Sequence, residues 1–192
     1  MAKSKTKREK LIDSALDMFF EKGYERTTID DIVNRAECGK GTFYRYFSNK
    51  EKLVEILNEN FILSLSETLK KKCKPELEPK EYMFALIKSF LKVFKEHSRF
   101  GLIKFEIDMR LSQEQRNESA KKVIDKMGFI KEYFKQAIEK GKVKNFNPET
   151  IIHTIIGSAH YFLFREFKLG IPFTETELKE AIDIIFYGVK AE

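Results

Sequence analysis

Hydrophobic residues recur along this chain with the period of an α-helix. In the segment 5–22, Leu11, Ala15, Met18 and Phe19 fall on one helical face, and Gly23 is placed to end the helix. The same period, bounded by turn residues, predicts further helices over 28–36, 40–46, 49–72, 79–96, 100–111, 113–140, 148–168 and 175–190. The chain is therefore predicted to be all-α, with about nine helices.

Two of these helices carry a recognisable start signal. Thr28 precedes Asp31 by three residues, and Ser48 precedes Glu51 by three residues. This is the spacing of a capping box, in which a hydroxyl and a carboxylate each accept a bond from a backbone N–H of the first turn. We expect Thr28 and Ser48 to cap the helices that follow them.

One segment shows a different pattern. Hydrophobic residues alternate strictly with polar ones at Ile103, Phe105, Ile107, Met109 and Leu111, which is the period of a β-strand. A single strand in a helical chain has no partner to complete its backbone hydrogen bonds. We therefore predict a helix over 100–111.

The composition narrows the class of protein. The 192 residues are 42% hydrophobic and 34% charged, which is typical of a globular chain, and no apolar run approaches the ~20 residues that span a bilayer. Two cysteines and three histidines offer no disulfide framework and no set of metal ligands, so no cofactor is expected. Because the chain has no such apolar run and no signal-peptide stretch, we expect a cytoplasmic protein. Catalytic groupings and phosphate-binding loops are also missing from the sequence, so we expect that the protein is not an enzyme.

The basic charge of the chain is concentrated at its start. The net charge is +6, and the first ten residues contain five basic side chains and one acidic one, Glu9. Such an arm attracts phosphates because binding releases counterions from nucleic acid. This charge makes DNA a candidate partner.

The helices over 28–36 and 40–46 are short and are joined by a tight turn containing Gly39, which is typical of a helix-turn-helix.

In the second helix, Phe43 and Phe47 share one side, and Arg45 lies nearly opposite them. Gly41 and Thr42 share the outward side, and Tyr44 and Tyr46 flank it. A helix of this kind suits a major groove, since Gly41 permits close approach and Arg45 can bond a guanine edge. The alternative is an ordinary helical corner with exposed polar residues.

These residues also resemble a known family. The segments Thr27-Thr28-Ile29-Asp30-Asp31-Ile32, Lys40 to Phe47, and Asn49-Lys50-Glu51-Lys52-Leu53 are similar to the TetR family of bacterial transcriptional regulators. The resemblance implies a helix-turn-helix DNA-binding domain, here residues 1–48, and a ligand-binding and dimerisation domain, here residues 49–192. The chain departs from the family at Glu37, where the turn usually has Gly, and at Gly39, where Ser commonly caps the recognition helix.

The resemblance also assigns roles to single residues. Contact with bases or with the groove falls to Lys40, Gly41, Thr42 and Arg45. Contact with phosphates falls to Thr27, Thr28, Tyr44, Tyr46 and Lys50.

Two further sets of residues are predicted in the remainder of the chain. An apolar, aromatic-lined ligand pocket is implied around Phe84, Phe90, Phe94, Phe105, Met109, Phe129 and Tyr133, although any single Phe among them is more often a core residue. The last two helices are implied to form a four-helix dimer interface through Ile155, Gly157, Ala159, Ile182, Ile185 and Phe186.

The resulting functional prediction is a homodimeric repressor that a small apolar or aromatic ligand releases from a palindromic double-stranded DNA operator. The alternative is a DNA-bound adaptor that is controlled by a protein partner and binds no small molecule. In either case no membrane contact is expected.

Overall fold

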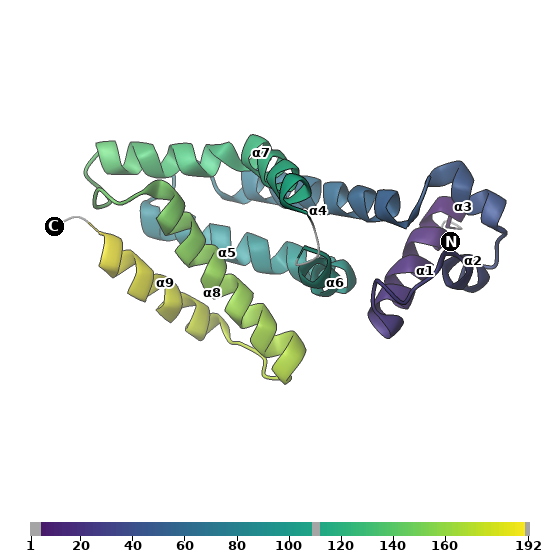
Figure 1. The fold of residues 1–192 in the computed structure, drawn as a ribbon. Coiled ribbons are helices and arrows are strands. Elements are labelled where there is room, and N and C mark those ends of the chain that lie inside the picture. The colour runs from purple at the N-terminus through teal and green to yellow at the C-terminus, as the bar shows by residue number, and fades with distance from the viewer. Residues whose placement is uncertain (1–4, 109–111, 191–192) are drawn as a thin grey trace. The chain divides into compact units, whose positions relative to one another are not determined.

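The computed structural model describes residues 5–108 and 112–190, and within these ranges the chain is all-α, as predicted (Figure 1). Most helix boundaries agree with the predicted ones to within two residues, because hydrophobic period and capping residues both act locally. The helices are α1 (Lys7–Lys22), α2 (Ile29–Arg35), α3 (Lys40–Tyr46), α4 (Lys50–Lys72), α5 (Pro79–Glu96), α6 (Ser98–Asp108), α7 (Gln113–Glu139), α8 (Pro148–Leu169) and α9 (Glu175–Val189).

One predicted cap is confirmed and the other is wrong. The Thr28 hydroxyl accepts a bond from the backbone N–H of Asp31, and the Asp31 carboxylate accepts one from the N–H of Thr28. At the start of α4, however, the side chain of Asn49 accepts from the N–H of Lys52 at 2.7 Å. Asn49 can replace Ser48 as the cap because asparagine is an equally strong N-cap residue. The Glu51 carboxylate is bound elsewhere, by the hydroxyl of Tyr24.

The alternating segment is helical as far as it is described, since α6 extends to Asp108. Phe100, Ile103 and Ile107 are buried, and their spacing of three and four residues is that of one helical face. The strand-like alternation is therefore overridden by the packing of the helix. Met109 and Leu111 lie outside the described residues.

The chain divides into two compact units. The N-terminal unit comprises Met1–Phe61 and His97–Glu118, so that α6 joins α1, α2, α3 and the first part of α4. The core of this unit includes Leu11, Phe19, Ile32, Phe43, Phe47 and Leu53. A division of function at residue 48 stays a prediction, because these units are defined by packing.

The C-terminal unit comprises Ile62–Glu96 and Ser119–Glu192. Its core is built around α5, whose side chains Tyr82, Met83, Leu86 and Ile87 are almost completely buried. Helices α8 and α9 lie side by side, and both contact α5 (Figure 1). In the described ranges, no helix combines the length and the apolar character needed to cross a membrane.

Candidate nucleic-acid interface

The turn between α2 and α3 is closed by two backbone hydrogen bonds. The N–H of Cys38 donates to the carbonyl of Val33 at 2.9 Å, and the N–H of Glu37 donates to that of Asn34 at 3.2 Å. This is a Schellman motif, which requires a left-handed residue directly after the helix cap. Glu37 occupies that position with φ of 52°, a conformation that glycine adopts much more readily. The family that the sequence resembles usually has glycine at this position, and the left-handed conformation explains why.

We expect Glu37→Gly to stabilise the N-terminal unit, because it removes the steric cost of a left-handed side chain. After subtraction of the greater freedom of glycine in the unfolded chain, the gain is about 0.5–1 kcal/mol in the free energy of unfolding. Thermal unfolding measures it. Glu37→Gln is the matched control, since it removes the charge and retains the strain. A rise in melting temperature for Gln equal to that for Gly would show that charge, not backbone strain, is responsible.

Helix α3 presents the two sides that its sequence predicts. Phe43 and Phe47 are buried, with ring centroids 5.4 Å apart, and they fix the helix to the core of the unit. Arg45 is exposed on the opposite side. Its guanidinium lies 4.8 Å from the centre of the Tyr46 ring and donates to the Tyr46 hydroxyl at 3.1 Å. The guanidinium is thus held at the surface by a neighbouring side chain and is accessible to a partner.

The start of α3 is small and open. Gly39 caps the helix without a side-chain hydrogen bond, in agreement with the predicted loss of a serine cap. A Cβ atom built on Gly41 meets nothing within 4 Å, so the packing of the unit does not require glycine there. Glycine also destabilises a helix. Its presence here is therefore best explained by a partner that approaches the backbone closely.

Lys40 lies beside this open surface and is paired with Asp30 of α2. Its ammonium is 2.9 Å from the Asp30 carboxylate, and that hydrogen bond raises the pKa of Lys40. Both side chains are more than half exposed, so the pair is weak and a DNA phosphate can compete for the lysine. Thr42 is half-buried and Tyr44 is exposed on the same helix.

Several residues that were predicted to contact DNA phosphates instead form hydrogen bonds within the protein. Thr27 is 1% exposed, and its hydroxyl donates to the carbonyls of Met18 and Gly23. The hydroxyl of Thr28 takes part in the capping box, where hydrogen bonds from Lys22 and Thr28 lower the pKa of Asp31 to about 2. The ammonium of Lys50 is directed at backbone carbonyls of the α1–α2 loop. Thr27 is therefore not available for contact with a phosphate.

The predicted ligand residues lie in several separate contacts of the C-terminal unit. The Tyr133 ring stacks on Tyr82, and the Phe90 ring packs against Phe94 and His160. The remaining described rings, those of Phe84 and Phe129, lie beneath the ammonium groups of Lys88 and Lys70 respectively. Phe105 is in α6 but its side chain is not among those described, and Met109 lies outside the described residues. A common pocket around these residues stays a prediction.

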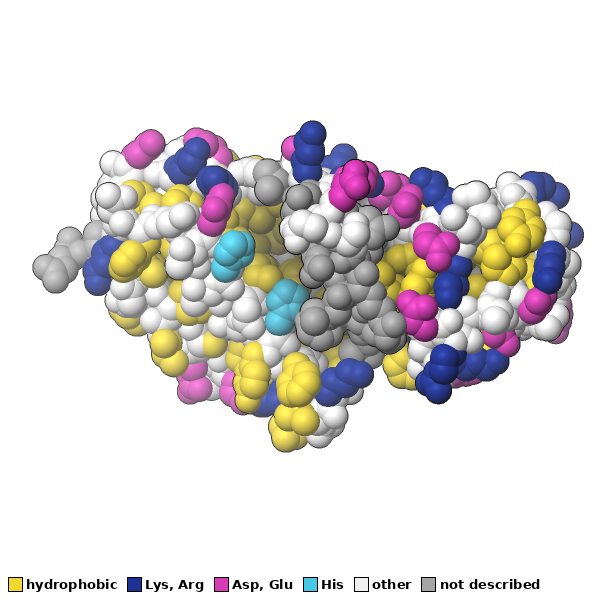
Figure 2. All heavy atoms as spheres, in the orientation of Figure 1, with side chains coloured by type: hydrophobic (Ala, Val, Ile, Leu, Met, Phe, Trp, Pro, Cys, Tyr) yellow, Lys and Arg dark blue, Asp and Glu magenta, His cyan; other side chains and the backbone are white. Residues whose placement is uncertain are grey.

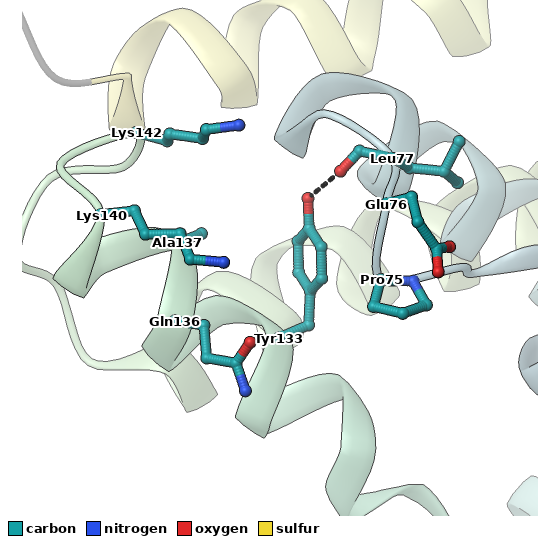
Figure 3. A pocket seen from close by; sticks show the side chains of 8 residues that line it. All are labelled: Pro75, Glu76, Leu77, Tyr133, Gln136, Ala137, Lys140 and Lys142. Carbon is teal, nitrogen blue, oxygen red and sulfur yellow. Dashed lines mark hydrogen bonds between the residues drawn. The ribbon is translucent and has the colours of Figure 1, made fainter.

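Of the predicted ligand residues, Tyr133 lines a pocket that the structure does describe (Figure 3). Its hydroxyl donates to the carbonyl of Leu77 at 2.6 Å. The pocket has a volume of about 50 Å³, whereas sites for drug-sized ligands have roughly 300–1,000 Å³. Polar side chains dominate its wall, so it does not fit the apolar ligand site predicted from the sequence. The lining residues are Pro75, Glu76, Leu77, Tyr133, Gln136, Ala137, Lys140 and Lys142.

The predicted interface residues require a correction. Ile155, Ala159 and Ile182 are at most 1% exposed within a single chain, so they belong to the core of the C-terminal unit and cannot contact a second copy in this arrangement. Gly157 is exposed, and Ile185 and Phe186 are half-buried.

Large apolar side chains are instead exposed on other faces of α8 and α9. Hydrophobic atoms reach the surface over the end of α8 (Figure 2). The exposed fractions are 59% for Tyr161, 52% for Phe164, 77% for Ile184 and 62% for Tyr187. We call these four residues the α8–α9 apolar face. Exposed apolar side chains of this size on two neighbouring helices are typical of a protein interface.

Comparison with known proteins identifies a family match in the N-terminal unit. Residues 11–57, which include α2, α3 and the start of α4, match the model of the bacterial regulatory proteins of the tetR family. The chain is 29% identical over 162 residues to the uncharacterized HTH-type transcriptional regulator YhgD of Bacillus subtilis, covering 74% of this chain and 75% of that protein. It is 24% identical over 196 residues to the HTH-type transcriptional repressor KstR2 of Mycobacterium tuberculosis, covering 97% and 94%.

Solved structures of such regulators share the fold. The ketosteroid transcriptional regulator KstR2 superposes with a TM-score of 0.77 at 22% identity, over 99% of this chain and 98% of that one. A proposed fatty acid metabolism regulator of Clostridium perfringens superposes with a TM-score of 0.75 at 23% identity, over 95% and 100%. The arrangement of helices described above is therefore that of a set of bacterial regulators.

Proposed function

Because the chain belongs to the TetR family of bacterial transcriptional regulators, we propose that it is a dimeric repressor of a palindromic DNA operator, released by a small apolar or aromatic ligand. One observation carries the proposal. Helix α3 is anchored by Phe43 and Phe47, while Gly41 and Arg45 lie exposed on its surface. A short helix with a small residue near its start and a guanidinium beyond it can lie in a major groove and read bases.

The side chains of α3 divide into two kinds of contact. We assign base reading to Arg45, because its planar guanidinium can donate two bonds to the O6 and N7 atoms of guanine. Phosphate contact falls to the exposed Tyr44 and to Lys40, whose pair with Asp30 is open to solvent. Such contacts fix the register of the helix without reading sequence.

A palindromic operator requires two such helices. In a twofold dimer each α3 would enter one half-site, with the two half-site centres ~34 Å apart along the duplex. We propose that the α8–α9 apolar face forms the dimer interface. Gly157 supports this, since a Cβ atom at this position meets nothing within 4 Å and packing in the chain does not demand glycine there.

The proposed ligand is apolar. Two observations support this class: the aromatic side chains of α5 and α7, and the similarity of the fold to a ketosteroid regulator and a fatty acid metabolism regulator. A ligand that favours a dimer with its α3 helices at the wrong spacing would lower operator affinity by about 5- to 150-fold for a coupling of 1–3 kcal/mol. Loss of operator binding on addition of a long-chain acyl or steroid compound tests this. The adaptor alternative expects operator affinity to be unchanged by every such compound.

The glycine of α3 provides a test in which stability and function change in opposite directions. Gly41→Ala should stabilise the N-terminal unit by up to about 1 kcal/mol, because alanine favours a helix and its methyl group has free space. The same methyl group should obstruct the approach of DNA and weaken operator binding about 10-fold or more. Thermal unfolding and fluorescence anisotropy with an operator selected from random duplexes measure the two effects.

The control for this test is Gly128→Ala in α7, where a Cβ atom also meets nothing within 4 Å. It should change stability in the same direction and leave DNA affinity unchanged. Normal operator binding by Gly41→Ala would contradict the placement of α3 in the groove. Failure of the wild-type protein to select any duplex would contradict the proposed function itself.

A further inference from the structure

The first residue of α4 is bound to the loop that connects α1 to α2. The ammonium of Lys50 donates to the carbonyl of Tyr24 at 2.7 Å and to that of Thr27 at 3.0 Å, and it lies 3.5 Å from the carbonyl of Glu25. It also lies 4.2 Å from the centre of the Tyr24 ring. An ammonium group has three donors, and here all three have backbone acceptors within reach.

The next residue of α4, Glu51, is hydrogen-bonded to the side chain of the same tyrosine, Tyr24. The hydroxyl of Tyr24 donates to the Glu51 carboxylate at 3.2 Å, and the ring packs edge-on against Phe19 with centroids 5.2 Å apart. Burial and the nearby Glu51 charge raise the pKa of Tyr24, so the phenol remains a donor at neutral pH. Two consecutive side chains of α4 therefore bind one buried residue of the α1–α2 loop.

The other end of the loop leads directly into α2. The hydroxyl of Thr27 is bonded to the carbonyls of Met18 and Gly23, which belong to the end of α1. Thr28, the next residue, is the cap of α2. The carbonyl that Lys50 holds at Thr27 is thus one residue from the start of the helix-turn-helix. We call Lys50, Tyr24, Glu51 and Thr27 the α4 joint.

We propose that Lys50 is a positioning residue for DNA recognition and that it acts through the α4 joint instead of through a DNA phosphate. This inference rests on the proposed function and deepens it. By drawing the carbonyls of the loop toward the start of α4, the ammonium sets where α2 begins and hence where α3 presents Arg45. Recognition groups must be held to within about 0.5 Å and 10–20° to remain productive, so a small shift of α2 reduces specific binding.

The two possible roles of Lys50 differ in the property that they change. A lysine that neutralises a phosphate contributes equally to binding of all sequences, and its loss makes the plot of log affinity against log salt shallower by about one unit. A positioning lysine contributes chiefly to the preferred sequence. Its loss leaves the salt slope almost unchanged and reduces the ratio of specific to non-specific affinity.

The experiment uses the full chain, a duplex selected by the wild-type protein from a random pool, and a random duplex of the same length. Lys50→Met is compared with Lys52→Met, which removes a neighbouring exposed lysine whose ammonium pairs with Glu55. For Lys50→Met we expect affinity for the selected duplex to fall about 10-fold, affinity for the random duplex to change less than about 2-fold, and the salt slope to change by less than about half a unit. Lys52→Met should retain the specificity ratio.

Two further variants keep the test decisive if Lys50→Met does not fold. Lys50→Arg preserves the charge, so a phosphate contact would survive, whereas a planar guanidinium cannot place its donors on the same converging carbonyls. Tyr24→Phe breaks the bond to Glu51 without removing a cation, and should lower the specificity ratio at an unchanged salt slope. Thermal unfolding verifies that each variant is folded at the assay temperature.

The outcomes separate the two proposals. Loss of specificity in Lys50→Arg and Tyr24→Phe supports the α4 joint. Equal losses for both duplexes with a shallower slope in Lys50→Met, or an unaltered specificity ratio in Lys50→Arg and Tyr24→Phe, would overturn it and leave the repressor proposal intact. A wild-type protein that selects no sequence would overturn the repressor proposal instead.

Discussion

Replacing Arg45 with alanine is expected to weaken operator binding by about 1–3 kcal/mol, which corresponds to roughly 5- to 150-fold in the dissociation constant. We expect this loss because the exposed guanidinium is the group of α3 best suited to bond a guanine edge with two donors at once. Because the side chain is exposed and its hydrogen bond is to the adjacent Tyr46, its removal should leave the fold unchanged. Anisotropy titrations at one fixed salt concentration measure the loss.

The position of the loss matters as much as its size. Arg45→Ala should relax the base preference at one position of each half-site, and Arg45→Lys should retain the charge but lose most of the preference. Tyr46→Phe is the matched control, since it removes the hydroxyl that accepts from Arg45 and keeps the ring beneath the guanidinium. An unchanged base preference in Arg45→Ala would contradict its assignment to base reading.

The orientation of Arg45 could be predicted because it follows from helix geometry alone. Two phenylalanines four residues apart define the buried side of α3, and Arg45, midway between them in sequence, lies on the opposite side of the helix and must face outward. The cap at Thr28 was predictable for a similar reason, since its partner Asp31 is three residues away. The choice of Asn49 over Ser48 was not, because both residues can cap a helix and the tertiary contact between Glu51 and Tyr24 decides between them.

The roles of Thr27 and Lys50 depend on contacts that no local pattern encodes. Thr27 is bonded to Met18, nine residues away, and Lys50 reaches Tyr24 across 26 positions. In the sequence, each is a polar side chain near a helix start, which is also where phosphates bind. The structure distinguishes the two possibilities because it reveals which acceptors already surround the hydroxyl and the ammonium.

The apolar residues of α8 and α9 illustrate a second limit of sequence patterns. Periodicity identifies apolar faces of a helix, but it does not indicate whether a face is covered by the same chain or by another. The stripe through Ile155 and Ala159 packs on the chain's own core, as does Ile182. Tyr161 of α8 and Ile184 of α9 lie outside this buried stripe and are exposed. The three-dimensional structure of the chain is needed to distinguish the two kinds of face.

A charge on the α8–α9 apolar face is accordingly expected to have the largest effect of all. Ile184→Asp should convert the proposed dimer to monomers, because burying an uncompensated carboxylate costs about 3–5 kcal/mol and a twofold interface contains the substitution twice. Ile184 is 77% exposed in the single chain, so the change should leave the fold of the monomer intact. Sedimentation velocity measures the mass, and anisotropy with the selected duplex measures the consequence for DNA binding.

The control is Leu63→Asp, which places the same charge on an apolar residue of α4 that is 44% exposed and lies outside the α8–α9 apolar face. It should remain dimeric. Monomers of Ile184→Asp should still bind a single half-site weakly but lose the advantage of two linked half-sites, which amounts to about 100-fold or more in affinity. If Ile184→Asp sediments as a dimer while binding the operator normally, the interface must lie elsewhere, and Ile185 and Phe186 are then the next positions to test.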